Sequence, residues 1–149
     1  MKKAIKYAYH KKYLIIVVTN QSGVARGLHS ENDIKTLHGE INRRLKLINC
    51  KIHDFFYCPY HPKYGNKKYK KDSFLRKPNP GMIFKAVKKW NIDLKKSYMI
   101  GDRWKDVRAG INAGCKTIFI NNNYKESKHV DANFTADTLL DAVYIIEKV

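Results

Sequence analysis

The sequence predicts an α/β fold, a Rossmann-like parallel sheet flanked by helices. Residues 13–19, YLIIVVT, form a continuous β-branched run that is typical of a strand buried on both faces of a parallel sheet. Residues 30–48 instead repeat apolar residues at helical spacing, and strand-like and helix-like segments alternate along the chain. With 149 residues, the chain suits one domain, which we expect to span residues 1–149.

The first half of the chain predicts two strands and two helices. Residues 1–12 place small apolar residues on one face among lysines and predict a short amphipathic helix. After the first strand, a polar loop runs over residues 20–27, and Ser30 with Asp33 resembles a capping box. The helix that follows carries one apolar stripe, and residues 52–57 predict the next strand. The stripe consists of Ile34, Leu37, Ile41, Leu45 and Ile48.

The second half begins with a long irregular segment over residues 58–79, which predicts a functional loop. A helix then starts near Pro80, with a strand at residues 98–100 and another helix leading to Gly114. A strand at residues 116–120 and a final helix complete the pattern. The buried faces of these helices are expected to comprise Met82, Ile83, Ala86, Val87 and Trp90, then Val107, Ile111 and Ala113, then Leu139, Leu140, Val143 and Ile146.

The net charge of +17 raises the question of nucleic-acid binding. The basic residues are spread along the whole chain, however, and only residues 63–71 form a dense run with interleaved aromatics. A solvated loop, or a surface that attracts anionic small substrates, is therefore the favoured interpretation. No apolar run could span a membrane or act as a secretory signal, and three cysteines suit free thiols, so we expect a cytoplasmic protein with no membrane partner.

Two carboxylates follow the strand at residues 98–100. Asp102 and Asp106 are four residues apart, so they straddle one helical turn and can face a single hard cation such as Mg²⁺. Ligand crevices in α/β sheets lie beyond the carboxyl ends of the strands, which is where these residues are expected. An equally good alternative is a helix N-cap at Asp102 and a solvated Asp106.

Two further pairs, Thr19 with Asn20 and Arg76 with Lys77, are expected in loops at the same edge of the sheet. A hydroxyl, a cation and a metal-holding acid are the groups that stabilise a transferring phosphoryl group. Taken singly, Thr19 is better explained as an ordinary strand residue and Lys77 as a solvated lysine. Their order along the chain favours phosphoryl chemistry.

Four segments together resemble the haloacid dehalogenase superfamily, in particular its branch of D-glycero-D-manno-heptose 1,7-bisphosphate and histidinol phosphatases. They are VVTNQSGVARG at 17–27, CPYHP at 58–62, RKPNPGM at 76–82 and MIGDRWKDVRAGINAG at 99–114. The resemblance extends from Met1 to about Ile120. It implies a Mg²⁺-dependent phosphomonoesterase that acts on a phosphorylated sugar, of the heptose bisphosphate type.

The resemblance also implies roles for individual residues. Thr19 and Lys77 would be catalytic, since Thr19 would bind the transferring phosphate and Lys77 would neutralise it. Asp102 would ligate Mg²⁺, with Asp106 supporting it. The substrate-binding residues would be Asn20, Gln21, Ser22, Arg26 and Arg76.

The chain departs from the family pattern at its beginning. The family's Asp-x-Asp-Gly-Thr segment, which carries the nucleophile, is absent, and no acidic residue precedes Glu31. We therefore expect a truncated domain that lacks about thirty residues and its first strand. That strand would lie between the strands ending at Thr19 and Ile100. Its absence would expose unpaired strand edges, so weak stability or self-association through the exposed sheet is expected.

The family's zinc-binding loop is also incomplete. Cys58 is retained, but Tyr60 stands at the His position with His61 one residue later, and Ser73 and Leu75 replace two cysteines. Two ligands cannot close a tetrahedral site, so no structural zinc is expected.

Three hypotheses therefore stay open. The chain is the greater part of a sugar-phosphate phosphatase, a catalytically dead remnant that binds a phosphosugar or a partner subunit, or, as the weakest alternative, a basic nucleic-acid-binding module.

Overall fold

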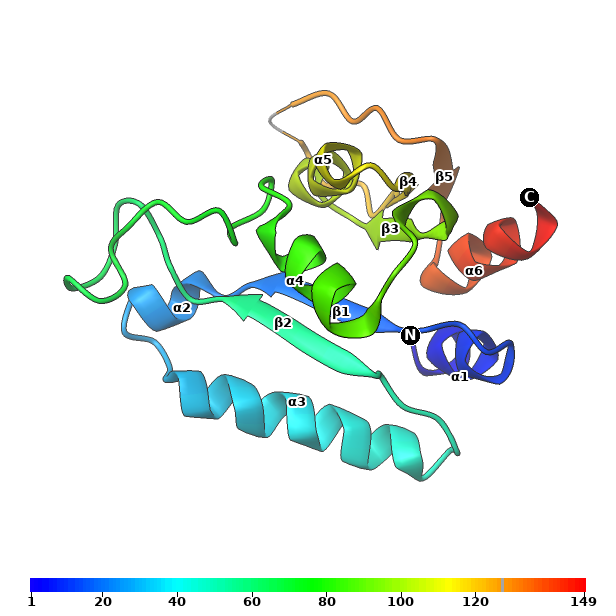
Figure 1. The fold of residues 1–149 in the computed structure, drawn as a ribbon, viewed down its shortest axis with the longest axis horizontal. Helices are drawn as coiled ribbons and strands as arrows, with labels where there is room; N and C mark the ends of the chain where they lie inside the picture. The colour runs from blue at the N-terminus through cyan, green and yellow to red at the C-terminus, as the bar shows by residue number, and fades with distance from the viewer. Residues whose placement is uncertain (127) are drawn as a thin grey trace.

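The computed structural model describes residues 1–126 and 128–149, and its strands and helices alternate as an α/β fold requires (Figure 1). The fold class is therefore confirmed. In chain order the elements are α1 (Lys2–His10), β1 (Ile16–Asn20), α2 (Ser22–Ala25), α3 (Glu31–Lys46), β2 (Asp54–Cys58), α4 (Gly81–Trp90), the short 3₁₀ helix η1 (Leu94–Lys96), β3 (Tyr98–Gly101), α5 (Trp104–Ala113), β4 (Lys116–Ile120), β5 (Phe134–Ala136) and α6 (Leu139–Lys148).

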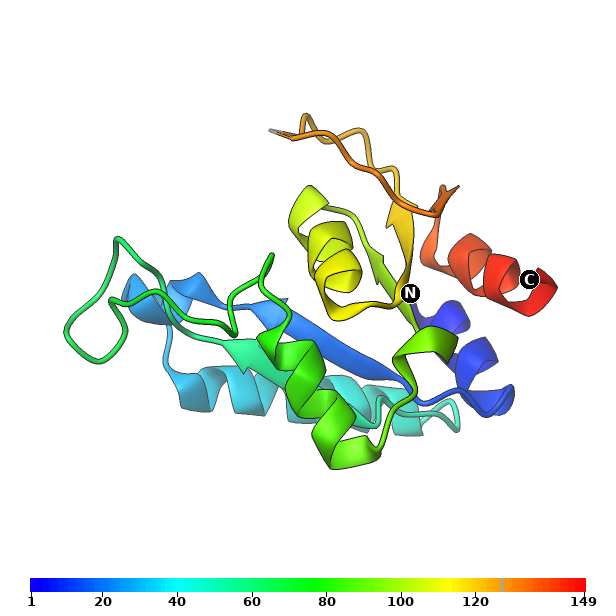
Figure 2. The same ribbon diagram turned by 45° about the horizontal axis from the view of Figure 1, so that its top comes forward.

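The strands form two separate parallel sheets where the sequence predicted one. The first sheet has the order β1-β2 and the second the order β3-β4-β5. Within the described residues, no backbone pairing joins β1 to β3, and we call this interruption the sheet break. The arrows of the two sheets lie in different parts of the molecule in both views (Figures 1 and 2).

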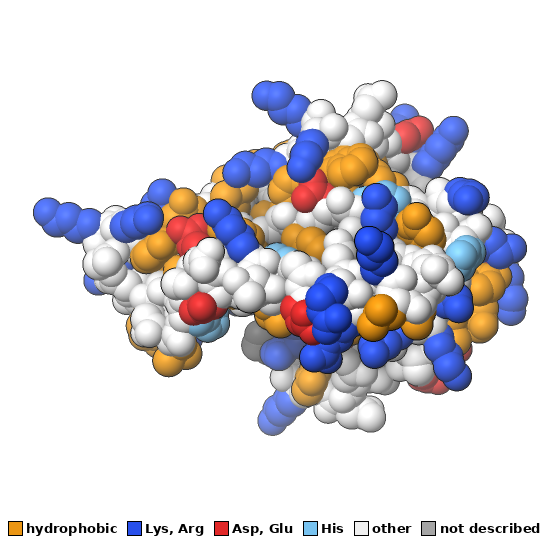
Figure 3. Space-filling model, turned by 90° about the horizontal axis from the view of Figure 1, so that it is seen from below, with side chains coloured by type: hydrophobic (Ala, Val, Ile, Leu, Met, Phe, Trp, Pro, Cys, Tyr) orange, Lys and Arg blue, Asp and Glu red, His pale blue; other side chains and the backbone are white. Residues whose placement is uncertain are grey.

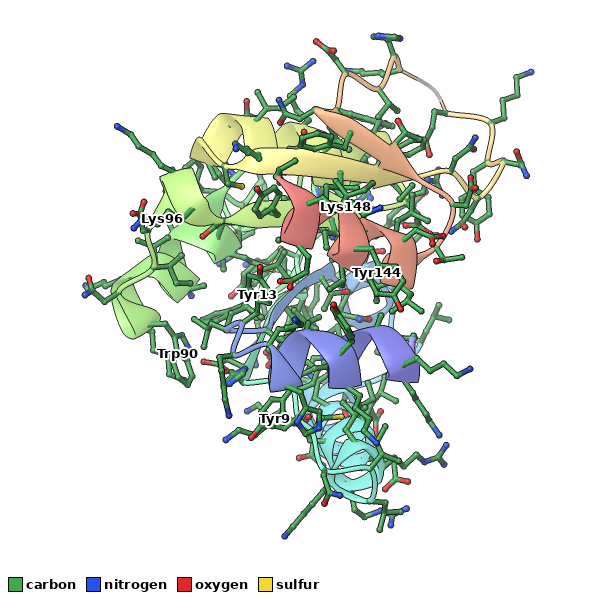
Figure 4. All side chains as sticks on the ribbon, turned by 90° about the vertical axis from the view of Figure 1, so that its right-hand side faces the viewer. Tyr9, Tyr13, Trp90, Lys96, Tyr144 and Lys148 are labelled. Atoms are coloured by element: carbon green, nitrogen blue, oxygen red, sulfur yellow. The ribbon has the colours of Figure 1, made fainter. Side chains whose placement is uncertain are left out.

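Two helix pairs hold the halves of the molecule together. The helix α4 packs on β1 and β2 and also on α5, which covers β3 and β4. The helix α1 packs on α6, which covers the second sheet. Figure 4 shows α1 beside α6, with Tyr13 labelled between the two halves. The Tyr13 hydroxyl donates a hydrogen bond to Glu147 Oε1 at 2.7 Å, which ties the start of the first sheet to α6.

The buried side chains form three clusters instead of one core. Ile5 and Leu45 lie in the first cluster, Val143 in the second and Ile118 in the third. A domain of this size usually has one contiguous core. The apolar run that predicted a fully buried strand is correspondingly only half-buried throughout β1. The expectation of a fully buried strand was wrong because, among the residues that the structure describes, no strand pairs with the edge of β1 that faces away from β2.

Most predicted elements are present, with local differences. Ser30 and Asp33 form the predicted capping box at the start of α3. Trp90 was expected in the core but is 36% exposed, because its indole N–H reaches the carboxylate of Asp54 at 2.8 Å. Leu37 and Ile111 were also expected to be buried but are 51% and 38% exposed. The strand β5 and the helix η1 were not predicted, and the polar loop expected over residues 20–27 contains the short helix α2.

The surface bears many cations. Lys and Arg side chains are scattered over the face shown in Figure 3, in keeping with their spread along the sequence. Among the residues that the structure describes, no helix is both long and apolar enough to cross a membrane.

Glu31 fastens the irregular segment to the first sheet. Its carboxylate accepts hydrogen bonds of 2.8 Å from the Tyr57 hydroxyl of β2 and the Tyr69 hydroxyl of the segment after β2. These bonds, that of Tyr57 foremost, lower the pKa of Glu31. Because the folded pKa lies below the unfolded value, this stabilisation is present above about pH 4.5 and is lost as the pH falls through the folded pKa.

Replacing Tyr69→Phe should therefore lower the free energy of unfolding by about 1 kcal/mol at pH 7, since one hydrogen bond to a partly exposed carboxylate is lost. The difference from wild type should shrink as the pH falls to 4, where Glu31 begins to take up a proton. Urea unfolding at both pH values measures this. Tyr64→Phe, on the same segment but exposed, is the matched control, and an equal loss in both variants would contradict the role of Glu31.

Candidate functional site

Lys77 lies at the carboxyl end of β1 and bridges the two halves of the molecule. Its Nζ donates hydrogen bonds to the Val18 carbonyl oxygen of β1 at 3.0 Å and to Asp106 Oδ1 of α5 at 2.6 Å. The Lys77 and Asp106 side chains are only 12% and 11% exposed. The alternative of one more solvated lysine is therefore wrong, because the cation is held between the buried Asp106 and the half-buried Val18.

The backbone of Lys77 is fixed by Asn20, the last residue of β1. The Lys77 N–H donates to Asn20 Oδ1 at 2.9 Å, and Asn20 Nδ2 donates to the Lys77 carbonyl oxygen at 3.1 Å. An amide side chain thus pairs with one residue's backbone as a neighbouring strand would. Asn20, predicted to bind substrate, here positions the lysine.

Both carboxylate oxygens of Asp106 accept hydrogen bonds. Oδ1 accepts from Lys77, and Oδ2 accepts from the Arg103 N–H at 3.1 Å at the start of α5. The side chain packs directly on Gly101, where a Cβ atom would lie 2.2 Å from Asp106 Cβ. Any side chain at Gly101 would therefore displace Asp106. The carboxylate that was expected to support a metal ion is held in this structure by a cation and a backbone amide.

The loop after β1 continues the site. Thr19 Oγ1 accepts a hydrogen bond from Gln21 Nε2 at 3.2 Å, and the Gln21 N–H bonds the Cys58 carbonyl oxygen of β2 at 2.8 Å. Gln21 therefore fixes the Thr19 hydroxyl at the end of the strand. Ser22 begins the short helix α2, and Arg26 follows it, exposed, with its guanidinium 4.3 Å from the centre of the Tyr64 ring.

Asp102 follows β3, as the strand-end rule predicted. Arg103, and not Asp102, is the N-cap residue of α5, so the alternative of an Asp N-cap was wrong. Asp102 Oδ2 accepts a hydrogen bond from Asn122 Nδ2 at 3.0 Å, and Asp102 Oδ1 accepts no hydrogen bond among the described residues. No cluster of three ligating side chains occurs in this part of the chain or elsewhere among the described residues. Mg²⁺ is commonly held by one or two carboxylates together with phosphate and water, so Asp102 fits a site that is completed by the substrate.

Cations converge around these groups. Burial lowers the pKa of Lys105, and the charges of Arg76, Arg103, Lys128 and Lys77 lower it further. Arg76 is half-buried and donates to the Tyr60 carbonyl oxygen at 3.4 Å. A group of like charges gathered at the ends of parallel strands attracts anions and would be relieved by a bound phosphate.

Sequence reasoning missed three residues of this region. Asn122 holds Asp102, Lys105 adds a cation, and Glu126 accepts hydrogen bonds from Arg103 Nε at 2.8 Å and the Trp104 N–H at 3.2 Å. Asn122 could have been found, since it follows β4 and the crevice rule applies to that strand as well. The partners of Glu126 are more than twenty residues away in the sequence, so no local sequence pattern predicts these contacts.

The incomplete zinc loop lies beside the site. Cys58 is fully buried, and burial raises the pKa of its thiol, which disfavours the thiolate that binds metals. His61 Nδ1 accepts a hydrogen bond from the Lys63 N–H at 3.0 Å. The absence of a structural zinc ion stays a prediction.

Comparisons with known proteins bear on this geometry. Residues 74–144 match the family model described as HAD-hydrolase-like. The D-glycero-alpha-D-manno-heptose-1,7-bisphosphate 7-phosphatase of Photorhabdus laumondii is 42% identical over 108 residues, which are 72% of this chain and 59% of that protein. The D-glycero-beta-D-manno-heptose-1,7-bisphosphate 7-phosphatase of Pasteurella multocida is 35% identical over 138 residues, 91% of this chain and 74% of that protein. The chain belongs to the haloacid dehalogenase-like hydrolase family.

A solved member of this family has the same fold. The D,D-heptose 1,7-bisphosphate phosphatase of B. bronchiseptica, solved with magnesium and phosphate, superposes with a TM-score of 0.86 at 24% identity and covers 99% of this chain and 81% of its own. The resemblance noted in the sequence is confirmed, including the heptose bisphosphate phosphatase branch. The chain spans only 57% to 62% of the first curated relatives that it matches, so the activity of those whole proteins is not established for it.

The buried ion pair should dominate the stability of the site. Lys77→Met leaves Asp106 without its cation and should lower the free energy of unfolding by about 3 kcal/mol, and Asp106→Asn should act in the same direction. The double variant Lys77→Met/Asp106→Asn should be less destabilised than the sum of the two single changes. Thermal and urea unfolding measure these values.

Lys85→Met, at an exposed position of α4, is the matched control and should change stability by less than about 0.5 kcal/mol. A Lys77→Met variant as stable as this control would show that the pair does not hold the halves together.

Proposed function

We propose that this chain forms the phosphate-holding part of a Mg²⁺-dependent phosphomonoesterase that acts on a phosphorylated sugar of the heptose bisphosphate type. The observation that carries the proposal is the largely buried Lys77 cation at the carboxyl end of β1, where its backbone pairs with Asn20, the residue after Thr19. Further support comes from the converging cations and from the names of the relatives, which are heptose bisphosphate phosphatases.

The residues have distinct tasks in this proposal. The Thr19 hydroxyl donates to a phosphate oxygen, and Lys77 neutralises the charge of the phosphoryl group as it develops during transfer. Arg76 binds a more distant part of the substrate, with Arg26, Gln21 and Ser22 shaping the entrance. Asn20 acts by holding the Lys77 backbone.

Asp102 is the proposed ligand of Mg²⁺, which neutralises phosphate charge when it is bound. Asp106 supports the site through Lys77 and does not need to touch the metal, since its oxygens already accept hydrogen bonds. No nucleophile is assigned, because the only carboxylate that contacts Lys77 among the described residues is this engaged Asp106.

The same observation supports a second candidate function, the binding of a phosphorylated sugar without turnover. Thr19, Lys77 and Asp102 could hold a phosphate and a metal ion, whereas a covalent step requires a carboxylate in line with the phosphorus. The two candidates share the binding site and differ only in hydrolysis.

The test uses the protein isolated from its native source, with its intact mass compared with the 17.4 kDa of this chain. Calorimetric titration with inorganic phosphate, with and without Mg²⁺, should show binding that Mg²⁺ strengthens. Release of phosphate from heptose 1,7-bisphosphate and from fructose 1,6-bisphosphate then separates an enzyme from a binding protein. Hydrolysis supports the first candidate, and binding without hydrolysis supports the second.

Thr19→Val should weaken phosphate binding about tenfold, since one charge-assisted hydrogen bond is lost. Asp102→Asn should abolish the effect of Mg²⁺ and leave metal-free binding nearly unchanged. Arg44→Met on the exposed side of α3 is the control. Phosphate binding that is equal in wild type and Thr19→Val, with or without Mg²⁺, would refute both candidates.

A further inference from the structure

We propose that the groove between α2 and the irregular segment after β2 binds a single strand of nucleic acid, with a base against Tyr64 and phosphates against the surrounding cations. The groove is lined by residues 24–28, 64–66 and Tyr69, and its volume of about 810 Å³ lies within the range of ligand-binding sites. This inference does not rest on the phosphatase proposal, because it does not use Thr19, Lys77 or Asp102.

Hydrogen bonds fold the irregular segment into a defined loop beside α2 (Figure 1). The His61 N–H donates to the Tyr69 carbonyl oxygen, and the Lys71 N–H donates to the His61 carbonyl oxygen, each at 3.1 Å. Gly65 has a φ of +104°, and a Cβ atom there would lie 2.9 Å from the Ala25 carbonyl oxygen. Only glycine therefore lets the loop approach α2 this closely. The walls of the groove are formed by the chain itself.

Cations lie over the aromatic rings of this loop. The Arg26 guanidinium is 4.3 Å from the centre of the Tyr64 ring, and Tyr64 is 44% exposed. Lys71 Nζ is 4.0 Å from the centre of the Tyr60 ring. Nucleic-acid bases stack on arginine planes as well as on aromatic rings, and such stacking tolerates any base. The pair of Arg26 and Tyr64 therefore offers a base a stacking surface and a charge together.

The positive charges of the loop are not balanced by acids. Within residues 59–76 the only acidic residue is Asp72. The lysines of this range are Lys63, Lys67, Lys68, Lys70 and Lys71. Their spacing alone favoured a solvated loop, but the structure places them around a groove with aromatic walls. Lysines at such a groove bind a phosphate backbone and release its counterions.

His61 lies between the groove and the cations near Lys77. Burial lowers the pKa of His61, and the charges of Arg76, Arg26 and Lys105 lower it further. Lys105 in turn is close enough to Arg76 and Lys77 for their charges to lower its pKa as well. A continuous region of positive potential thus joins the groove to the end of β1. Repeated phosphates suit such a region better than one small anion does.

The aromatic rings select the kind of polyanion. A phosphorylated sugar supplies charge but no flat π surface for Tyr64. The bases of a duplex are stacked on one another, so they are not free to stack on a protein ring. A single strand supplies both phosphates and free bases, which proteins bind with a positive groove and aromatic side chains.

Fluorescence anisotropy with fluorescein-labelled strands of about fifteen nucleotides tests the proposal on the intact chain. At about 0.15 M salt, a single strand should bind at least about tenfold more tightly than the duplex of the same sequence, since stacking needs unpaired bases. DNA and RNA strands of one sequence are compared. Tighter binding of either kind supports the proposal and assigns the source of the strand.

Tyr64→Ala should weaken binding of the single strand about tenfold, since one stacked base is lost. Tyr64→Phe keeps the ring and should bind as wild type does. This pair separates stacking from a general change in the loop. Equal binding by wild type and Tyr64→Ala would overturn the proposal, and so would a duplex that binds as tightly as the single strand.

A second pair of variants separates the groove from the overall charge. Lys67→Gln with Lys70→Gln should reduce the slope of log K against log salt concentration by about 1.4, since two phosphate contacts are lost. Lys95→Gln with Lys96→Gln removes the same charge from exposed positions of η1 and should leave the slope unchanged. Equal changes in both double variants would overturn the proposal, because the chain would then bind only through its net charge.

Discussion

The buried ion pair between Lys77 and Asp106 is the contact on which the rest of the structure depends. A cation and a carboxylate lose hydration when they are buried, so they persist only where further hydrogen bonds satisfy them. Here Lys77 donates a second hydrogen bond to the Val18 carbonyl oxygen, and Asp106 accepts a second hydrogen bond from the Arg103 N–H. The pair thereby connects an edge of the first sheet to the helix that covers the second.

This ion pair holds the carboxyl ends of the two sheets together, although the sheets are not joined by a strand. Within the described residues no strand joins β1 to β3, and the halves are held by helix packing and by side chains at each end of the break. Lys77 bridges the carboxyl end, and Tyr13 reaches Glu147 at the other. In the proposed site, Thr19 at the end of β1 and Asp102 after β3 serve one anion across this bridge. The stability of the fold and the geometry of the site share the same residues.

The sequence predicted the fold and the location of the site because both follow from local patterns. Apolar runs marked the strands, and the rule that ligands lie beyond the carboxyl ends of strands pointed to Asp102. The roles of Thr19 and Lys77 were implied only by the family resemblance and remain predictions. The tasks of Asn20 and Asp106 could not be predicted in this way. Their partner Lys77 is 57 residues from Asn20 and 29 residues from Asp106, and only the folded backbone brings them together.

The burial of β1 shows a second limit of sequence patterns. A continuous β-branched run predicts burial on both faces, and the helices do cover both faces. Only a neighbouring strand can cover the edge of a strand, however, and no pattern within the run predicts whether that neighbour is present.

A crystal structure of the protein grown with Mg²⁺ and phosphate would test the central claim most directly. The account predicts a phosphate ion within hydrogen-bonding distance of both Lys77 Nζ and Thr19 Oγ1, with Mg²⁺ bound between the phosphate and Asp102. A phosphate bound instead to the lysines of residues 63–71, with Lys77 still engaged only by Asp106 and Val18, would contradict it.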